Sequence, residues 1–390
     1  MNEYYNKGKQ TAGLLVSFLR WVVLASLLGA GLGVVSFVFH HGIELATELR
    51  GHHPWVLLCL PVAGAVIVWL YRVCGMAHDR GTNQIFNCVR TAQPVRLRTA
   101  PLIFISTILT HLVGGSAGRE GAALQLGGSV GDEIGRALRL DEKDQRILVM
   151  CGMSAAFSGL FGTPLTAAVF ALEVVSVGVM YHAALVPCLC ASLVSLEVTK
   201  LLGASATGYT VGTIPAVNLP VLGQTAVMGV LCAVVSVLFC KAVHTAPKLY
   251  AKIPIHPILR GALGGVLVLG LTILVGSQDY NGAGGHIITQ AVEQGQVVPW
   301  AFLLKILFTA VTLGAGFRGG EIVPVLFTGA TFGCAVSPLL GLDPAFGAAL
   351  GMVALFCGCT NCPMASTCWP LNCSVDRVCL CLRWFVRWPT

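Results

Sequence analysis

Charged residues are scarce in this sequence. Asp, Glu, Lys and Arg make up 11% of its 390 residues, whereas soluble globular chains contain about 25%. The hydrophobic share is 55%, and the mean hydropathy is +0.80. Such a chain has too few polar side chains to cover a surface that faces water on all sides. The composition therefore excludes an ordinary soluble enzyme, a disordered protein and a nucleic-acid-binding protein, and it predicts a polytopic membrane protein.

Two further features are missing. The N-terminal region has no short apolar stretch followed by a small-residue cleavage site, so we expect no cleaved signal peptide. A His-Glu-x-x-His or comparable helical motif is also absent from the sequence, which argues against an intramembrane metalloenzyme. The histidines at 40–41, 52–53 and 111 are the nominal candidates for metal ligands. We interpret the adjacent pairs as interfacial loop residues, and we expect neither a metal nor a cofactor.

Apolar segments are abundant but uneven in length. The first, Leu14–Phe39, is long enough to cross about 30 Å of hydrocarbon. Lys7 and Lys9 before it predict a cytoplasmic N-terminus. Trp55–Tyr71 is a second span, and the later segments, many bounded by glycine, are 101–113, 122–130, 147–179, 183–202, 221–243, 260–275, 300–315, 323–340 and 346–359. Short, glycine-broken segments are typical of transporters whose interrupted helices meet near the membrane midplane.

The chain contains an internal repeat. The residues from Gly152 to Pro164 align without gaps on those from Gly351 to Pro363, at an offset of 199 residues. Upstream, 118–120 aligns on 319–321 at an offset of 201. We therefore predict a cytoplasmic segment at 1–10, a first transmembrane half at 11–203, a second and incomplete half at 204–366, and an aberrant tail at 367–390.

Glu120 lies among apolar residues, in Gly114-Gly-Ser-Ala-Gly-Arg-Glu-Gly121. A charged side chain at bilayer depth costs about 3 kcal/mol on insertion scales, so an intramembrane acid is a functional candidate. Gly118 and Gly121 leave the backbone uncrowded, so consecutive N–H groups are able to face a small anion at a helix N-terminus. A carboxylate there either occupies the anion site or takes up a proton and swings away. The alternative is a helix-capping acid paired with Arg119.

For two other acids, a functional role must likewise be weighed against a structural one. Glu321 occupies the matching place in the second half, before Pro324, which suits the first turn of a helix. A functional acid and a capping acid are equally consistent with its position. Glu173 ends the apolar run that begins at Pro164, and we expect a structural role for it.

These residues carry a resemblance. Gly-Arg-Glu-Gly at 118–121, Gly-Gly-Glu-Ile-Val-Pro at 319–324 and the two Gly…Pro blocks resemble the CLC family of anion channels and proton-coupled antiporters, over about residues 11–366. The resemblance implies an all-α, dimeric CLC-type inverted repeat with broken, tilted helices and one pore per subunit. It implies that Glu120 is the gating glutamate. The anion site then lies near Gly118, Arg119, Gly121, Ala122, Gly320, Ile322 and Val323.

Four departures from chloride-type members narrow the branch. Where those carry Gly-Ser-Gly-Ile-Pro, this chain has Asp-Arg-Gly-Thr-Asn-Gln at 79–84. Ala122 replaces a customary proline, the 319–324 block lacks a Gly-x-Phe-x-Pro pattern, and Val174 stands where chloride antiporters have a second, proton-transferring glutamate. All four resemble the fluoride/proton antiporter branch, in which the acid at Glu321 is thought to take part in transport. The threonine usual in that branch is Val323 here.

Thr82 and Asn83 are candidate fluoride ligands. Fluoride is small and strongly hydrated, so its site must replace water with closely placed donors, which a hydroxyl, an amide and backbone N–H groups provide. Thr-Asn is also ordinary turn chemistry, and that interpretation of 79–84 as a loop is equally consistent with the sequence.

The repeat loses its pattern after Ser366. Residues 367–390 contain four Cys, three Trp and three Arg, an unusual mixture for a transmembrane helix. We interpret this tail as the product of a reading-frame shift or truncation, and we expect it to be loosely packed. A zinc site at Cys357, Cys359 and Cys362 or Cys368 has suitable spacing, but the first three of these residues lie in a repeat block that needs no metal.

The leading hypothesis is fluoride/proton antiport across the plasma membrane by a multi-pass homodimer, with fluoride or chloride, protons and the lipid bilayer as partners and no nucleic acid. Two alternatives stay open. One is a voltage-gated-type chloride channel or chloride/proton exchanger. The other is a membrane protein that does not transport because its C-terminus is defective.

Overall fold

The computed structural model describes residues 2–77, 79–176, 180–204, 208–211, 215–216 and 218–372. Helices dominate these residues, and the one extended pairing among them is a single bridge between Gly118 and Gly320. The elements are α1 (Asn2–His52), η1 (Pro54–Cys59), α2 (Leu60–Val73), α3 (Thr82–Thr91), α4 (Thr99–Leu112), α5 (Glu120–Ala137), α6 (Glu142–Phe161), α7 (Pro164–Glu173), η2 (His182–Ala184), α8 (Leu185–Leu201), α9 (Leu219–Lys252), α10 (Pro257–Val275), α11 (Gly285–Thr289), η3 (Gln290–Gln294), α12 (Ala301–Gly314), α13 (Ile322–Val336), η4 (Ser337–Leu340), α14 (Pro344–Thr360) and α15 (Pro363–Asn372).

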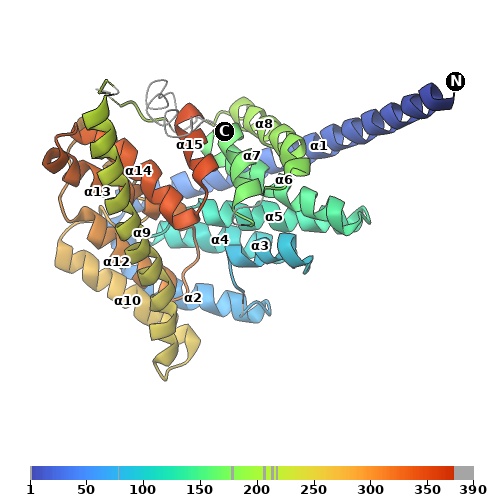
Figure 1. Cartoon of the computed structure of the whole chain (residues 1–390). Helices are drawn as coiled ribbons and strands as arrows, with labels where there is room; N and C mark the ends of the chain where they lie inside the picture. The colour runs from blue at the N-terminus through green and yellow to red at the C-terminus, as the bar shows by residue number, and fades with distance from the viewer. Residues whose placement is uncertain are drawn as a thin grey trace.

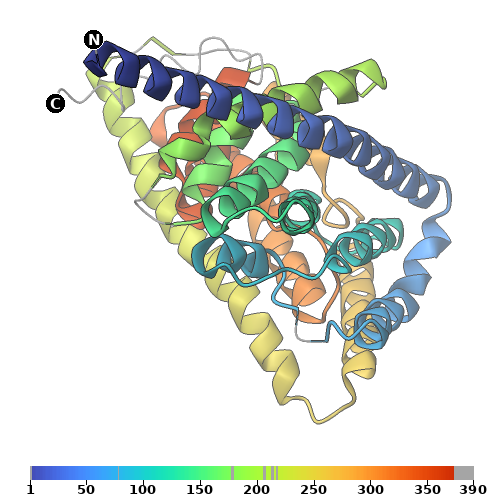
Figure 2. The same ribbon diagram turned by 90° about the vertical axis from the view of Figure 1, so that its right-hand side faces the viewer.

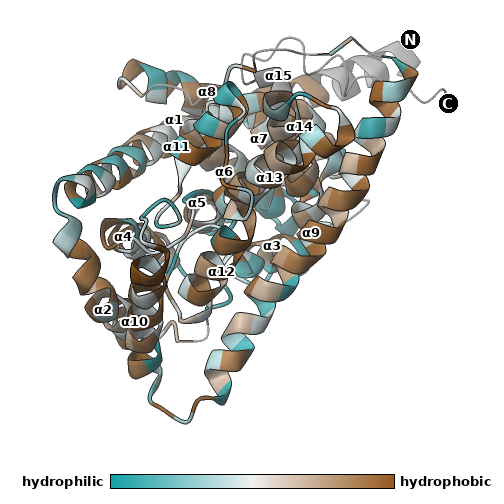
Figure 3. Ribbon diagram, turned by 90° about the vertical axis from the view of Figure 1, so that its left-hand side faces the viewer, coloured by the Kyte–Doolittle hydropathy of each residue, from teal (hydrophilic) through white to brown (hydrophobic). Residues whose placement is uncertain are grey.

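Six of the described helical stretches are long and apolar enough to cross a membrane. They are Gly13–His52, Pro54–Val73, His182–Leu201, Leu219–Lys252, Pro257–Val275 and Ile322–Leu340. The long helices α1 and α9 form two edges of the molecule (Figure 2), and hydrophobic residues colour much of α9 and α10 (Figure 3). The all-α membrane architecture predicted from the sequence is confirmed.

The two halves lie largely side by side, with the later helices on the left of Figure 1. Equivalent helices end in the same way. Gly162 and Asn361, which are 199 residues apart, are the left-handed residues that end α6 and α14, and each is followed two residues later by the proline that begins α7 or α15. The repeat found in the sequence is therefore a repeat of helix boundaries.

Glycines bring paired helices into close contact at matching places in both halves. A side chain on Gly127 of α5 would collide with the carbonyl of Gly152 of α6, and one on Gly329 of α13 would collide with the carbonyl of Gly351 of α14. Small residues at such crossings let helix backbones approach closely, which membrane helices need because lipid supplies little hydrophobic drive for association.

One expectation about local structure is wrong. Residues 79–84 are not all loop, because α3 begins at Thr82 after Gly81, whose φ of +63° favours glycine. The apolar segment 147–179 is broken, as the separate run that begins at Pro164 implies. It is divided at Gly162 and Thr163 into α6 and α7, because the left-handed Gly162 ends one helix and Pro164 suits the start of the next.

The expectation of a loosely packed tail is also wrong for its first residues. Thr367–Asn372 lies in α15, and the Trp369 side chain is only 3% exposed. Its ring meets those of Phe157, Phe161 and Phe356, with centroid distances of 6.1, 4.7 and 5.4 Å. Trp369 thus packs against both halves, because a large aromatic ring there fills the space between α6 and α14. The remainder of the predicted aberrant tail, 373–390, lies outside the described residues.

Candidate functional site

The loops that precede α5 and α13 meet inside the molecule. Gly118 N–H donates to the Gly320 carbonyl at 2.7 Å, and Gly320 N–H donates to the Gly118 carbonyl at 2.6 Å. A side chain on Gly320 would lie 2.6 Å from the nitrogen of Gly121 and 2.9 Å from that of Glu120. Only glycine allows this approach, so the glycines bring the N-termini of the two helices together.

Both helices leave backbone donors unused at this junction. The first N–H groups that donate within the helices are those of Ala123, to Arg119, and Val325, to Glu321. The earlier N–H groups, including those of the predicted anion-site residues Gly121, Ala122 and Ile322, are not needed by the helices. Two positive helix ends therefore face one region, which favours an anion.

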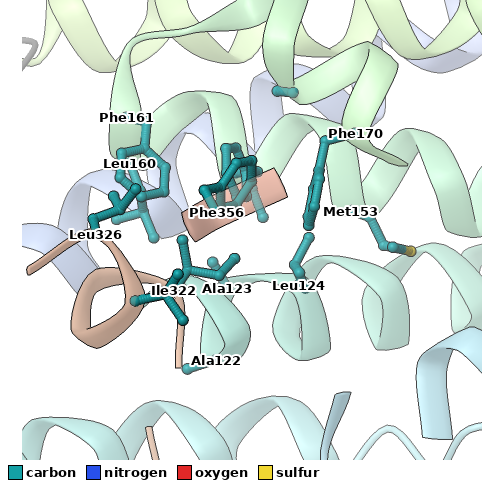
Figure 4. Close-up of a cluster of buried hydrophobic side chains, with 14 of the residues drawn as sticks. Ala122, Ala123, Leu124, Met153, Leu160, Phe161, Phe170, Ile322, Leu326 and Phe356 are labelled. Atoms are coloured by element: carbon teal, nitrogen blue, oxygen red, sulfur yellow. The ribbon is translucent and has the colours of Figure 1, made fainter. Parts of the chain in front are cut away.

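The side chains of Ala122 and Ile322 pack in the apolar core, so these two residues are able to contribute only their backbone N–H groups to the site. Ala122 is fully buried and Ile322 is 7% exposed. Figure 4 shows Ile322 of α13 beside Ala123 of α5, with Leu326 next to Leu160 and Phe356 close by. This apolar packing fixes the two helix ends relative to each other.

Glu120 begins α5 and is fully buried. Its Oε2 accepts the Arg119 backbone N–H at 2.9 Å, and its carboxylate also interacts with the backbone amide of Val323. The Oε1 atom has no hydrogen-bond partner among the described residues and lies 3.8 Å from the Arg119 Nε atom. A buried carboxylate needs such donors to offset its lost hydration. The Glu120 carboxylate therefore lies between the two helix ends, where an anion would bind.

A cavity of about 460 Å³ leads from this carboxylate to the surface. Glu120 and Val323 line it together with the exposed residues Glu44 and His286. Beside it, the Arg119 guanidinium contacts His40 Nδ1, and His40 Nε2 lies 3.0 Å from a Glu44 carboxylate oxygen. Polar groups thus continue from Glu120 to the outer part of this cavity.

Thr82 reaches the junction from α3, but Asn83 does not. The Thr82 hydroxyl donates to the Gly121 carbonyl at 3.3 Å and accepts from Gln125 Nε2 at 3.3 Å. The Asn83 side chain is exposed and forms no hydrogen bond with a described residue. Because successive residues of a helix point about 100° apart, only one of this pair is able to face α5.

Glu321 does not occupy the place that matches Glu120. The paired glycines are 202 residues apart, and so are the first residues of α5 and α13, Glu120 and Ile322. By this register Glu321 is the counterpart of Arg119, and the two have similar φ and ψ, −99° and −17° against −112° and −15°. The matching place predicted at an offset of 201 is therefore wrong by one residue.

The Glu321 side chain is exposed and makes no side-chain hydrogen bond that caps α13. The capping explanation is therefore wrong. The groups that interact electrostatically with this carboxylate include His244 and Cys240 of α9 and Cys359 of α14. Glu321 thus faces a different set of side chains from Glu120.

Comparison with known proteins identifies the architecture. The sequence pattern of the family described as voltage-gated chloride channel matches residues 63–373, which is most of the chain. The chain belongs to the voltage-gated chloride channel family. Membership of this family assigns the protein to transmembrane anion transport.

Relatives within this family differ in ion. The chain is 36% identical to a "chloride/fluoride channel protein" of Pseudomonas syringae pv. tomato, over 90% of this chain and 79% of the relative. It is 25% identical to the "H(+)/Cl(-) exchange transporter ClcA" of Vibrio cholerae, over 93% and 82%. The structure matches that of a "CLC-type fluoride/proton antiporter" with a TM-score of 0.88 and 29% identity, over 95% of both chains. A cyanobacterial Cl⁻/H⁺ antiporter has the same fold, with a TM-score of 0.76, 20% identity and coverage of 93% and 92%.

Two interactions of this family member were not predicted in detail. Asp79 forms an ion pair with Arg318 at 3.2 Å, which ties the loop before α3 to the loop before α13, and the Arg318 guanidinium lies 4.0 Å from the Tyr71 ring centre. The acid that begins the 79–84 motif was the signal in the sequence for this ion pair. Glu173 accepts hydrogen bonds from the backbone N–H groups of Met364 at 3.0 Å and Ala365 at 2.8 Å, so its expected structural role is confirmed as a cap on α15.

Across the described part of the chain, no three His, Cys, Asp or Glu side chains are placed to hold a metal ion.

Proposed function

We propose that this protein exchanges fluoride for protons and that Glu120 is its gate. The observation that carries the proposal is the fully buried Glu120 carboxylate at the meeting point of the α5 and α13 N-termini. The structural similarity of this chain to a fluoride/proton antiporter supports the coupled activity.

The gate works by competition for the same donors. The carboxylate of Glu120 accepts the Arg119 N–H and interacts with the Val323 amide, so it takes the place that an anion would take. Protonation removes its charge and therefore its attraction to the two positive helix ends. The neutral side chain leaves, an anion enters, and the proton is carried with the side chain. Coupling follows because one site accepts either the anion or the ionised glutamate.

Fluoride is favoured over chloride by the dimensions of this junction. A side chain on Gly121 would lie 3.1 Å from the Gly320 Cα and 3.3 Å from the Thr82 hydroxyl oxygen, so the backbone there is closely packed. Ile322 stands where the Gly-x-Phe-x-Pro block of chloride-type members has its phenylalanine. The Thr82 hydroxyl donates to the Gly121 carbonyl in this structure and would turn from that carbonyl to donate to the ion. In this proposal Gly118, Gly320 and Arg119 hold the junction, and the N–H groups of Gly121, Ala122, Ile322 and Val323 bind the ion. Glu321 takes part in transport from the α9 side. Asn83 is exposed and is the weakest of the predicted ligands.

Charge distribution supports an orientation in the plasma membrane. The segment 241–260, around the turn between α9 and α10, carries four Lys or Arg and no acid. The connection 276–300, at the other end of α10, carries two acids and no Lys or Arg. Positive loops face the cytoplasm, so we place the α9–α10 turn there. The last turn of α2 lies at this turn, since Arg72 Nη1 is 2.7 Å from His256 Nε2. Because α1 and α2 cross in opposite directions, the N-terminus is then on the same side. A homodimer is the assembly that the family resemblance implies, and cross-linking in native membranes tests it.

Ion flux from proteoliposomes tests the proposal. The purified 390-residue chain should release fluoride faster than chloride, as measured with ion-selective electrodes, and a fluoride gradient should drive proton movement. E120Q should abolish the proton movement. E142Q is the matched control, since Glu142 is also in the first turn of a helix but is exposed.

Each outcome separates the hypotheses. Equal release of both halides would favour a chloride channel or chloride/proton exchanger, and release of neither would favour a non-transporting protein. Undiminished proton coupling in E120Q would contradict the gating assignment, whereas a loss in E142Q would show that the assay reports misfolding.

A further inference from the structure

A second cavity lies at the end of the molecule where α2 and α9 finish and α10 begins. Its volume is about 290 Å³, and we call it the basic cavity. Three arginines, Arg72, Arg260 and Arg318, line it. The rest of its wall is largely apolar and includes Val68, Pro247, Pro257 and Ala315. It is distinct from the cavity that leads to Glu120, since no lining residue is shared.

Two of the three arginine charges are not neutralised. Arg318 is paired with Asp79 at 3.2 Å. Arg72 Nη1 instead lies 2.7 Å from the His256 Nε2 atom, and Arg260 Nε donates to the Ile255 carbonyl at 3.1 Å. Neither Arg72 nor Arg260 forms an ion pair with any residue that the structure describes. The basic cavity therefore carries a net positive charge that attracts an anion.

Two hydroxyl groups in the cavity wall are also unsatisfied. Tyr71 and Tyr250 are 2% and 8% exposed, and neither hydroxyl has a hydrogen-bond partner within the described part of the chain. A buried hydroxyl without a partner costs about 1–3 kcal/mol. A ligand with several acceptor oxygens would satisfy both hydroxyls and supply a counter-charge to the Arg72 and Arg260 guanidinium groups.

We propose that the basic cavity binds the phosphate of an anionic phospholipid headgroup from the cytoplasmic leaflet. A phosphate diester supplies the charge and the acceptor oxygens, and arginine is suited to bind it. Apolar side chains beside the cavity are exposed, namely Val73, Leu249 and Leu259, and α10 is largely hydrophobic in Figure 3. Acyl chains attached to the phosphate would cover them. Basic pockets between membrane helices on the cytoplasmic side are suited to such headgroups.

Lipid titration of the purified chain in mild detergent tests this proposal. Phosphatidylglycerol and phosphatidylcholine are compared by native mass spectrometry, which counts bound lipid. Wild type should retain phosphatidylglycerol and release phosphatidylcholine. Each arginine near a charged membrane surface contributes about fivefold in affinity, so R72Q/R260Q should bind phosphatidylglycerol about 30-fold more weakly. R98Q/R139Q is the matched control, because both arginines are exposed, form no ion pair with described residues and lie outside the cavity.

Equal retention of the two lipids, or unchanged phosphatidylglycerol binding in R72Q/R260Q, would overturn the proposal. Glycerol 1-phosphate and inorganic phosphate form a second arm. If either binds wild type as tightly as the lipid does, the phosphate chemistry stands but the lipid is not the occupant. Should the double variant fail to fold, R72Q alone, at an exposed position, should still weaken binding about fivefold.

Discussion

The entry into α5 in the first half and the entry into α13 in the second half follow the same backbone path. Gly118 and Gly320 form one reciprocal pair, and the residue after each has nearly the same conformation. The acids, however, stand at different points of this path. Glu120 is the first residue of α5, whereas Glu321 is the residue before α13.

This difference of one residue decides what each acid faces. Neighbouring positions at a helix start point about 100° apart. Glu120 is accordingly buried between the two helix ends, and Glu321 is exposed beside α9. The comparison teaches that a repeat conserves backbone position more strictly than side-chain role. In the function proposed above, the first half supplies the gate and both halves supply donors.

The largest expected effect is on fluoride flux, and it comes from disrupting the Gly118–Gly320 backbone pair that joins the two halves. In G320A the added Cβ would lie 2.6 Å from the Gly121 nitrogen, and backbone cannot move aside as a side-chain end does. In G118A the nearest atom is Glu120 Oε2, at 2.5 Å. We therefore expect G320A to lower fluoride flux by about tenfold or more, and by more than G118A does.

Fluoride efflux at equal protein content measures this difference. G229A is the control, because no atom lies within 4 Å of a Cβ placed on that glycine of α9. Equal flux in G320A and wild type would show that the close approach of the halves is unnecessary.

The next largest effect concerns the aromatic contact between the halves. W369A removes a side chain that is 3% exposed and packs on Phe157, Phe161 and Phe356. Truncating a buried tryptophan costs about 3–5 kcal/mol, so the thermal unfolding midpoint in detergent should fall clearly. W55A, at an exposed position, should change it little. A midpoint unchanged in W369A would mean that α15 does not hold the halves together.

The sequence predicted those features of the fold and the site that depend on local patterns, and it did not predict those that depend on tertiary packing. Composition, the apolar segments and the Gly…Pro blocks predicted a two-half helical membrane protein, because these signals are local or additive. The one-residue shift between Glu120 and Glu321 was not predictable, because identical letters aligned at an offset of 201 while the helices begin 202 residues apart. The contact of Thr82 with α5 and the pairing of Asp79 with Arg318 depend on tertiary packing, which no local pattern specifies.

A smaller effect tests whether the two halves use their glycine crossings alike. G127A places a methyl group against the Gly152 carbonyl, and G329A places one against the Gly351 carbonyl. Overpacking costs about 1–3 kcal/mol, and the two variants should lower the unfolding midpoint by similar amounts. A drop in only one variant would show that the halves are packed differently despite their matching helices.

The smallest effect concerns the cap that the first half places on the second. E173Q keeps the size of the side chain but removes the charge that faces the Met364 and Ala365 N–H groups. Charge at a helix N-terminus contributes about 0.3–1 kcal/mol, so we expect a slight loss of thermal stability and unchanged ion coupling. Loss of proton coupling in E173Q would instead assign Glu173 to the proton route.

The ratio of fluoride to proton flux in E120Q and E321Q, measured in the same proteoliposomes, tests the central claim most directly. Since only Glu120 lies between the two helix ends, E120Q should lose proton movement and so change the ratio, whereas E321Q should slow both ions by the same factor and leave the ratio at the wild-type value. A wild-type ratio in E120Q, or an equal loss of coupling in both variants, would contradict the claim that the two halves divide these roles.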